Sequence, residues 1–408
     1  MLGAMFAWWN RWQTRKRLGP LRSHRYERFG AIVQLGRWFP RALVFVDRAR
    51  ARTLGLVDPP AGLWDGPEPV FGPDTRLVAP LEAHLQLTNR CAAGCAACYT
   101  AATPSGLAGE WGLEEFCLAI DELAAAGVFH VALGGGESAH LPWLGALLVH
   151  CRHRGIVPNL TTSGLYARDV LQRLCDLARQ GLFGQINVSM DGTHGVYRAV
   201  RGHDGFAAAD RAVVALTAAY PHVGLNTVVT RPGLLALGDL FGYARQRGVT
   251  EIEFLRLKPS GRGNRKEVLQ PLGPTREQYE RLLPTVLALA RQHRVRARFD
   301  CSLTPFVVRH NVSPDLLRFV SIQGCAGGDY VVAARADGQM AACSFVAPVP
   351  ALITELRAYL ARPDAFPGFR EVISAPCRSC HHQPMCRAHC RAFDETPGPG
   401  CPAYGSVA

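Results

Sequence analysis

From about residue 80 to residue 257, short apolar segments alternate with longer stretches of helical periodicity. The expected strands are His84–Thr88, His130–Leu133, Val157–Thr161, Gln185–Met190, Gly224–Val229 and Glu251–Leu257. The expected helices between them are Leu113–Ala126, Leu141–Arg154, Ala167–Gln180, Phe206–Ala219 and Leu235–Gln246. Strands that alternate with helices form a parallel sheet with right-handed crossovers, and sites in such sheets lie at the carboxyl ends of the strands. The fold class is therefore α/β, and six such units suit either a partial barrel or an open doubly wound sheet.

The 408 residues can bury a large core and are long enough for about two or three domains. A Pro/Gly-rich stretch, residues 59–73, precedes the six units. Before it, the patterns predict two strands, Ala31–Leu35 and Ala42–Asp47, and a short helix, Arg48–Leu54. The predicted domains are residues 1–79, an accessory domain; residues 80–270, the α/β core; residues 271–320, a bridging helical region; and residues 321–408, a cysteine-rich domain.

The composition, with 48% hydrophobic residues and a mean hydropathy of +0.03, is typical of a globular chain. No uncharged apolar run reaches the roughly 18 residues that span a bilayer, so we expect no membrane association. An apolar stretch, Met5–Trp9, precedes a basic cluster at Arg11, Arg15, Lys16 and Arg17. A secretory signal has the opposite order, which predicts a cytoplasmic protein.

The net charge of +12 is unevenly distributed, because residues 1–60 contain twelve Arg or Lys and three Asp or Glu. Such a basic segment can attract nucleic acid, an anionic membrane or an acidic peptide, or it can be a solvated surface. The charge lies in one accessory segment and no recognised nucleic-acid motif accompanies it. The sequence therefore argues against nucleic acid as a partner.

Eight of the fourteen cysteines fall in two short windows, residues 91–98 and 377–401. In a reducing compartment, such clustering indicates metal sites rather than disulfides. Cys117, Cys151 and Cys175 lie within helical apolar patterns instead, and we expect them to be buried small hydrophobic residues.

Cys91, Cys95 and Cys98 have the spacing Cys-x3-Cys-x2-Cys on the loop after the first expected strand. Three thiolates can hold three irons of a 4Fe–4S cube, and the fourth iron is then free for another ligand. This motif resembles the signature of the radical S-adenosylmethionine (SAM) enzymes. The resemblance implies a partial (β/α)6 TIM-like barrel in which the open iron chelates SAM through its amine and carboxylate. An electron from flavodoxin or ferredoxin would cleave SAM to a 5′-deoxyadenosyl radical, which abstracts hydrogen from unactivated carbon.

Segments at the ends of the following strands resemble further motifs of this family. The residues that the resemblance places in contact with SAM are Gly135, Gly136, Glu137, Ser163, Ser189 and Arg201. Glycines let the backbone approach a ligand closely, so the Gly-Gly-Glu peptide groups would bind the methionyl amine. Ser189 and Arg201 would bind the carboxylate, because a guanidinium can bind both of its oxygens. Each polar residue alone would indicate only a helix cap or a loop hydrogen bond, but their placement at successive strand ends favours a cofactor site.

The cysteines near the C-terminus resemble the SPASM extension of radical SAM peptide-modifying enzymes. They are Cys325, Cys343, Cys377, Cys380, Cys386, Cys390 and Cys401. The resemblance implies two auxiliary 4Fe–4S clusters, an outer one on Cys377, Cys380, Cys386 and Cys401 and an inner one on Cys325, Cys343 and Cys390. The alternative is a structural zinc ribbon, because Cys-x2-Cys pairs also suit zinc.

Relatives whose inner cluster is fully ligated have one more cysteine shortly before the position of Cys325, and the stretch Leu317–Gln323 has none. We therefore hypothesise a three-cysteine inner cluster with an open iron. Cys301 would fill the open position if the intervening segment folds back, and Asp300 is a further candidate.

The resemblance predicts an oxidoreductase that modifies a ribosomally made (RiPP) precursor peptide or protein and forms a crosslink or an oxidised residue. The accessory domain would bind the precursor's leader, for example by adding a strand to a sheet edge. The alternatives are an anaerobic sulfatase maturase, a small-molecule radical dehydrogenase and a metal-stabilised peptide-binding protein without catalysis. A sulfatase maturase has an aspartate after the cysteine that matches Cys343, where this chain has Ser344. The sequence does not identify the substrate, the bond formed or the catalytic acid or base.

Overall fold

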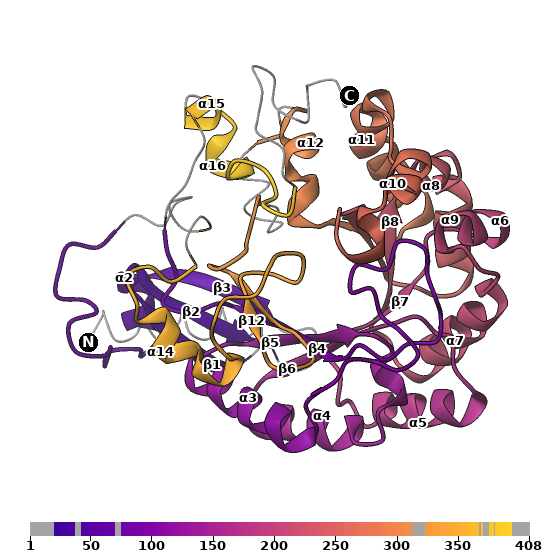
Figure 1. Ribbon diagram of the computed structural model, residues 1–408. Coiled ribbons are helices and arrows are strands. Elements are labelled where there is room, and N and C mark those ends of the chain that lie inside the picture. Colours follow the sequence, from indigo (N-terminus) through magenta and orange to yellow (C-terminus); the bar gives the residue numbers. More distant parts are fainter. Residues whose placement is uncertain are drawn as a thin grey trace.

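The computed structural model of the protein describes most of the chain (Figure 1). The described residues are 20–36, 42–69, 75–310, 312–313, 323–366, 369, 375–378 and 380–393. Cys401, the N-terminal basic cluster and residues 317–322 lie outside them. Within the described residues, no helix is long and apolar enough to cross a membrane.

The centre of the structure is a sheet in which six parallel strands follow one another in chain order. They are β4 (Glu82–Thr88), β5 (His130–Gly135), β6 (Val157–Thr162), β7 (Ile186–Ser189), β8 (Val223–Val229) and β9 (Glu251–Arg256). These strands confirm the six predicted from the sequence, with bounds that differ by at most two residues. Their consecutive order is that of a barrel, because the strand order of a doubly wound sheet reverses at a switch point.

Three further strands, which the sequence patterns did not predict, extend the sheet on both sides. β10 (Arg296–Phe299) pairs with β9 and is parallel to it. β11 (Val331–Ala334) pairs in parallel with β4, and β12 (Met340–Ala341) is antiparallel to β11. The described sheet therefore ends at β10 and β12 without closing, and the prediction of a partial barrel is confirmed.

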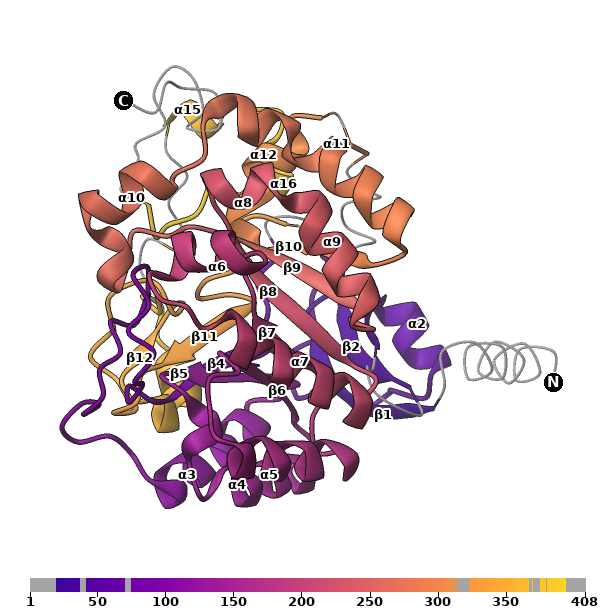
Figure 2. The same cartoon turned by 90° about the vertical axis from the view of Figure 1, so that its right-hand side faces the viewer.

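Helices cover the outer face of the curved sheet (Figures 1 and 2). They are α3 (Leu113–Ala125), α4 (Leu144–His153), α5 (Arg168–Arg179), α6 (His194–Arg201), α7 (Phe206–Ala219), α8 (Arg231–Leu235) and α9 (Leu237–Gln246). Along β4, Ala83, Leu85 and Leu87 are buried in the apolar core that the sheet shares with these helices. Glu82 and His84 alternate with them and are half-buried on the opposite, inner face. This alternation gives the barrel an apolar exterior under the helices and a polar interior.

The N-terminal region forms a separate antiparallel sheet of β1 (Leu21–Glu27), β2 (Gly30–Leu35) and β3 (Ala42–Asp47), followed by α2 (Arg48–Thr53). The prediction of β2, β3 and the helix is confirmed, whereas β1 was not predicted. The buried Arg48 side chain donates to the carbonyl oxygens of Trp64 (3.1 Å) and Gly66 (2.7 Å), so the chain after α2 folds back beside this sheet.

Two buried charged residues join the N-terminal sheet to the barrel. The Arg25 guanidinium pairs with Glu27 at 2.7 Å and donates to the carbonyl oxygens of Pro80 (2.7 Å) and Gly127 (2.9 Å). Glu27 also accepts a hydrogen bond from the Val78 amide at 2.9 Å. Burial raises the pKa of Glu27, and the charge of Arg25 opposes this rise. The ion pair therefore keeps an otherwise unfavourable carboxylate in the interface.

The chain beyond β9 adds helices around the open side of the barrel. They are α10 (Lys266–Leu272), α11 (Arg276–His293), α12 (Thr304–Val308), α14 (Leu356–Leu360), α15 (Ala375–Arg378) and α16 (Gln383–Cys386). Four short 3-10 helices complete the described elements: η1 (Ser138–His140), η2 (Gly261–Asn264), η3 (Cys301–Leu303) and η4 (Ile353–Glu355). α12 packs against α16, so the cysteine-rich C-terminal segment lies beside the bridging helices (Figure 1). The domain boundaries stay a prediction.

Replacing Arg25 by methionine is expected to destabilise the folded protein by about 3–5 kcal/mol, because Glu27 would stay buried without its partner. The loss should be larger at mildly alkaline than at mildly acidic pH. Burial already raises the pKa of Glu27 in the folded state, and removal of Arg25 raises it further, so stability falls as pH rises through that pKa. Thermal and denaturant unfolding at both pH values measure the effect.

The matched control is Arg154→Met, which breaks the half-exposed pair of Arg154 with Asp121. Such surface pairs contribute about 0–1 kcal/mol, so this variant should stay close to the parent protein. Equal unfolding midpoints for both variants would contradict the role assigned to Arg25.

Candidate active site

The loop that carries Cys91, Cys95 and Cys98 leaves the carboxyl end of β4 without forming a helix or a longer strand. All three cysteines are half-buried and unbridged. Gly94 has φ +65°, a conformation that glycine adopts without strain, and it turns the loop between the first two cysteines. Burial raises the pKa of the Cys91 thiol, and Glu137, Cys95 and Cys98 add to the rise.

Backbone groups at the base of the loop and on α6 hold the loop backbone. The Cys91 amide donates to the carbonyl oxygen of Thr103 at 2.7 Å, which closes the base of the loop. The Ala96 amide donates to the carbonyl oxygen of Arg201, the last residue of α6, at 2.9 Å. The loop is therefore held against the unit that follows β7.

Arg262, in η2 beyond β9, binds the loop at three points. Its guanidinium donates to the carbonyl oxygens of Cys95 (2.9 Å) and Ala102 (2.7 Å). Its backbone amide donates to the carbonyl oxygen of Cys98 at 2.9 Å. Hydrogen bonds from a charged donor contribute about 1.5–3 kcal/mol each to stability, so Arg262 strongly stabilises the position of the cysteine loop.

The glycines at the end of β5 lie directly against the start of this loop. Gly135 has φ +111°, and a Cβ there would lie 2.4 Å from the carbonyl oxygen of Thr88. A Cβ on Gly136 would lie 2.2 Å from the carbonyl oxygen of Arg90. Glycine is thus required here for close packing of two chain segments. Contact of these peptide groups with SAM stays a prediction.

Glu137 is buried and ties the end of β5 to the end of β6. Its carboxylate accepts hydrogen bonds from the Thr162 hydroxyl (2.7 Å), the Ser163 amide (2.8 Å) and the Ser163 hydroxyl (2.5 Å). The Glu137 amide donates to the carbonyl oxygen of Arg90 at 2.9 Å. The structure therefore brings two predicted cofactor-contact residues, Glu137 and Ser163, together beside the cysteine loop.

Arg201 lies between a buried carboxylate and the second cysteine of the loop. It forms an ion pair with Asp191 at 2.5 Å, and its guanidinium lies 3.9 Å from the Cys95 sulfur. Burial lowers the pKa of Arg201, but Asp191 and the Cys95 thiolate more than offset this and raise it. The His203 imidazole lies 3.3 Å from the same sulfur. Arg201 and His203 thus both contact the sulfur of the second cysteine of the loop.

Ser189, at the end of β7, belongs to a polar layer that crosses the barrel interior. In the register of the parallel strands, Ser189 lies beside Asn226 on β8, Asn226 lies beside Glu253 on β9, and Glu253 lies beside Arg298 on β10. No hydrogen bond of the Ser189 hydroxyl occurs among the residues that the structure describes. Among the predicted SAM-contact residues that have a side chain, Glu137, Ser163 and Arg201 already bind other described residues. Ser189 does not, so its hydroxyl is available to a ligand.

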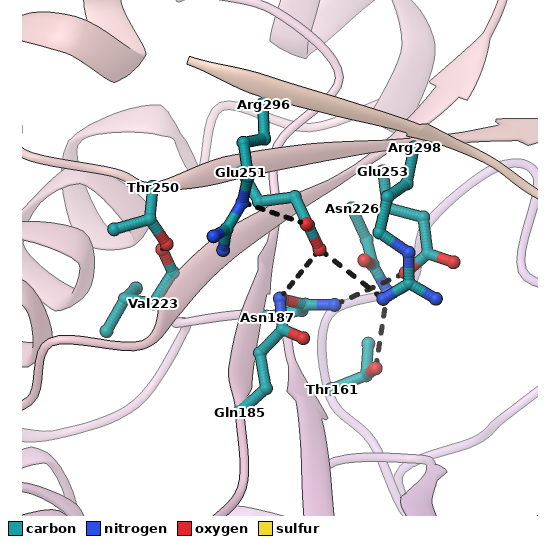
Figure 3. Close-up of polar contacts among 10 residues, drawn as sticks. All are labelled: Thr161, Gln185, Asn187, Val223, Asn226, Thr250, Glu251, Glu253, Arg296 and Arg298. Carbon is teal, nitrogen blue, oxygen red and sulfur yellow. Dashed lines mark hydrogen bonds and ion pairs between the residues drawn. The ribbon is translucent and has the colours of Figure 1, made fainter. Parts of the chain in front are cut away.

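Polar side chains of β6 to β10 point toward one another inside the barrel (Figure 3). Asn187 donates to Glu253 at 3.4 Å, and Asn226 donates to the Thr161 hydroxyl at 3.3 Å. Burial raises the pKa of Glu253, although the neighbouring Arg298 acts in the opposite direction. The Oδ1 atom of Asn226 is buried without a described partner, so an acceptor is available in this interior.

On the opposite side of the interior, His84 links β4 to the C-terminal segment. Its Nδ1 lies 3.1 Å from the Ser344 hydroxyl, and its Nε2 lies 3.3 Å from the Glu82 carboxylate. Burial opposes ionisation of Glu82, but His84, His130 and Arg298 bring its pKa down to about 2. Ser344, His84 and Glu82 therefore form a line of polar contacts that runs from the C-terminal segment into the barrel.

Six of the seven C-terminal cysteines are described, and Cys401 is not. Cys386 and Cys390 are buried, and the other four are half-buried. Among the described residues, no three His, Cys, Asp or Glu side chains lie close enough to hold one metal ion. A 4Fe–4S cube binds each thiolate through a different iron, so the distances between sulfurs that it requires differ from those around a single metal ion. The ligand assignments to auxiliary clusters stay a prediction.

Sequence reasoning did not assign two side chains, Arg262 and His203, to the cysteine loop. Neither belongs to a motif that identifies its partner, because both reach the loop only after the barrel has formed. The one available signal was the position of Arg262 directly after the last expected strand, at the edge where the loops of such a barrel meet.

Comparison with known proteins identifies relatives over most of the chain. Residues 85–234 match the radical SAM superfamily. An AdoMet-dependent heme synthase of Methanosarcina barkeri is 24% identical over 325 residues, which cover 75% of this chain and 90% of the relative. A PqqA peptide cyclase of Methylocella silvestris is 26% identical over 336 residues, which cover 78% of this chain and 85% of the relative. The structure of Streptococcus suis SuiB bound to precursor peptide SuiA shares the fold, with a TM-score of 0.71 at 13% identity over 90% of this chain and 94% of that one.

Replacing Arg262 by methionine is expected to lower the iron and acid-labile sulfide retained by the anaerobically purified protein several-fold. The side chain would lose both hydrogen bonds to the loop carbonyls, and the three cysteines would no longer be held in position. Colorimetric iron and sulfide analysis measures the loss. The control is Arg265→Met, an exposed arginine three residues later, which should retain the parent content. Unchanged iron in the Arg262 variant would contradict the bracing role.

Proposed function

Because residues 85–234 match the radical SAM superfamily, we propose that this chain is a radical SAM peptide maturase that acts on a ribosomally made precursor. In this proposal it abstracts hydrogen from the precursor and leaves a crosslink or an oxidised residue. The main support is the placement of Cys91, Cys95 and Cys98 at the carboxyl mouth of a barrel with a polar interior. The names of two relatives agree, since one is a peptide cyclase and the other is bound to a precursor peptide.

The residues at the mouth of the barrel suit the cofactors that this family uses. When bound on Cys91, Cys95 and Cys98, a 4Fe–4S cluster with SAM would supply the radical that removes hydrogen from carbon. The Arg201 guanidinium lies 3.9 Å from the Cys95 sulfur and, in this proposal, also faces the SAM carboxylate. The free hydroxyl of Ser189 would bind the same carboxylate. The methionyl amine of SAM would lie against the peptide groups of Gly135, Gly136 and Glu137, with Ser163 beside them.

The barrel interior supplies groups that can position a polar substrate side chain and move a proton. Asn226 offers an unpartnered acceptor in the same layer as Ser189. The line of Ser344, His84 and Glu82 provides a hydroxyl, an imidazole and a carboxylate in hydrogen-bonding sequence. Such a line offers a hydroxyl, an imidazole and a carboxylate for general acid–base catalysis.

The remaining assignments belong to the same proposal. The outer auxiliary cluster would bind Cys377, Cys380, Cys386 and Cys401, and the inner one would bind Cys325, Cys343 and Cys390. Flavodoxin or ferredoxin would supply electrons, in the cytoplasm. The N-terminal sheet would bind the precursor's leader, because β1 and β3 are the outer strands of its described residues and a peptide can pair with such an edge.

Replacing Cys95 by alanine is expected to abolish formation of 5′-deoxyadenosine from SAM by the reconstituted, dithionite-reduced protein. The thiolate is a required iron ligand in this proposal, and no other described cysteine lies on the same loop besides Cys91 and Cys98. Liquid chromatography of the nucleoside measures the loss. Cys175→Ala changes a buried cysteine of α5 and should keep the parent rate. Formation of 5′-deoxyadenosine at the parent rate by the Cys95→Ala variant would contradict the proposal.

Co-expression of the enzyme with a short peptide encoded beside its gene is expected to change the peptide's mass by the loss of one or more pairs of hydrogen atoms. Such a loss accompanies a crosslink or an oxidation, and tandem mass spectrometry locates it. The Cys95→Ala enzyme serves as the control and should leave the peptide unchanged. If SAM is cleaved but only a small molecule is altered, the alternative of a small-molecule enzyme holds instead.

A further inference from the structure

The sequence leaves the inner auxiliary site with three cysteines, Cys325, Cys343 and Cys390. Cys301 lies 24 residues before Cys325 and is separated from it by α12. A distant cysteine can complete the site only if the chain returns it to the other three. The contacts around the end of β9 determine whether it does.

Lys258, just after β9, joins the segments of Cys301 and Cys343. Its ammonium group forms an ion pair with Asp300, the residue before Cys301. The same ammonium lies 4.3 Å from the centre of the Phe345 ring, two residues after Cys343. One buried side chain thus holds both cysteine segments at one point.

The segment of Cys390 meets the same strand two residues earlier. The Arg256 guanidinium at the end of β9 lies 3.6 Å from the centre of the Phe393 ring. The Phe393 amide donates to the carbonyl oxygen of Cys390 at 3.2 Å, so this ring is part of the turn that carries the cysteine. The third segment therefore reaches the same end of β9.

The chain before Cys325 is tied to two of these segments. The Thr304 hydroxyl, three residues after Cys301, donates to the carbonyl oxygen of Gln323 at 2.8 Å. The Gly324 amide donates to the carbonyl oxygen of Met385 at 2.6 Å, and Met385 belongs to α16, before Cys390. The segment that carries Cys325 is thus fixed between the other two.

Lys258 is buried where these segments meet, and its charge acts on Cys301, Cys343 and Cys390. A buried cation beside these sulfurs suits a group that carries net negative charge.

The other candidate ligand, Asp300, is already engaged on both oxygens. Its Oδ2 atom pairs with Lys258, and its Oδ1 atom accepts from the Ser302 amide (3.1 Å) and the Ser302 hydroxyl (2.5 Å). The Cys301 thiol forms no hydrogen bond among the described residues and is free to bind iron.

We propose that Cys301 is the fourth thiolate of the inner auxiliary site, with Cys325, Cys343 and Cys390, so that this site has no open iron. The inference rests on the proposed function, which assigns iron–sulfur clusters to the C-terminal cysteines. It replaces the three-cysteine hypothesis drawn from the sequence, because the contact of Thr304 with Gln323 brings the segments of Cys301 and Cys325 together.

The test uses the full-length chain with Cys91, Cys95 and Cys98 replaced by alanine, which removes the SAM-site cluster and its open iron. This background and its Cys301→Ala, Cys301→Ser and Cys175→Ala derivatives are reconstituted anaerobically with iron-57 and sulfide. The reduced samples are treated with carbon-13 cyanide and measured by Mössbauer and electron–nuclear double-resonance spectroscopy. Iron and sulfide contents are determined in parallel.

A carbon-13 coupling is expected in the Cys301→Ala sample and not in the background or its Cys175→Ala control. Cys301→Ser should keep its iron and show altered Mössbauer parameters, because an oxygen replaces one sulfur ligand. Equal cyanide coupling with Cys301 intact would overturn the inference, as would spectra that Cys301→Ala leaves unchanged. A background without any iron would overturn it too, whereas 5′-deoxyadenosine formation by the parent enzyme tests the proposed function separately.

Discussion

The backbone of the loop that carries Cys91, Cys95 and Cys98 must find hydrogen-bond partners outside itself, because it has no helix or regular strand of its own. The partners come from the end of β5, the last residue of α6 and Arg262 beyond β9. Each belongs to a different unit of the barrel, so the loop acquires its shape only when the sheet from β4 to β9 is assembled. Buried polar groups left unpaired cost about 1–3 kcal/mol each, which couples the geometry of the site to the stability of the fold.

The strands divide the barrel into an apolar outer layer and a polar interior. The outer residues pack under helices and form one continuous core. The inner residues bind one another, and burial holds the pKa of Glu253 above its usual range while His84 and its neighbours hold that of Glu82 at about 2. Two carboxyl groups in one interior therefore differ in proton affinity. Such a pair gives the interior one carboxyl group that holds a proton more readily and one that stays charged.

The parts of the fold that follow local periodicity were predictable from the sequence, and those that depend on distant partners were not. The six barrel strands were found because apolar residues alternate or cluster within each of them. β1 was missed because its inward side chains include Arg25 and Glu27, whose burial depends on their ion pair and on backbone partners far along the chain. The three-cysteine motif and its strand-end neighbours were visible as spacing. The partner of Arg201 and the return of Cys301 were not, since both depend on contacts that no local pattern encodes.

The parallel pairing of β11 with β4 has a consequence for how the chain reaches its native state. The first strand of the barrel acquires one of its two neighbours only from residues about 250 positions later. Until that stretch has left the ribosome, one edge of β4 offers unpaired amides and carbonyls to any other extended chain. Synthesis of the barrel thus exposes a surface prone to aggregation, and a chaperone or rapid completion of the C-terminal half would protect it.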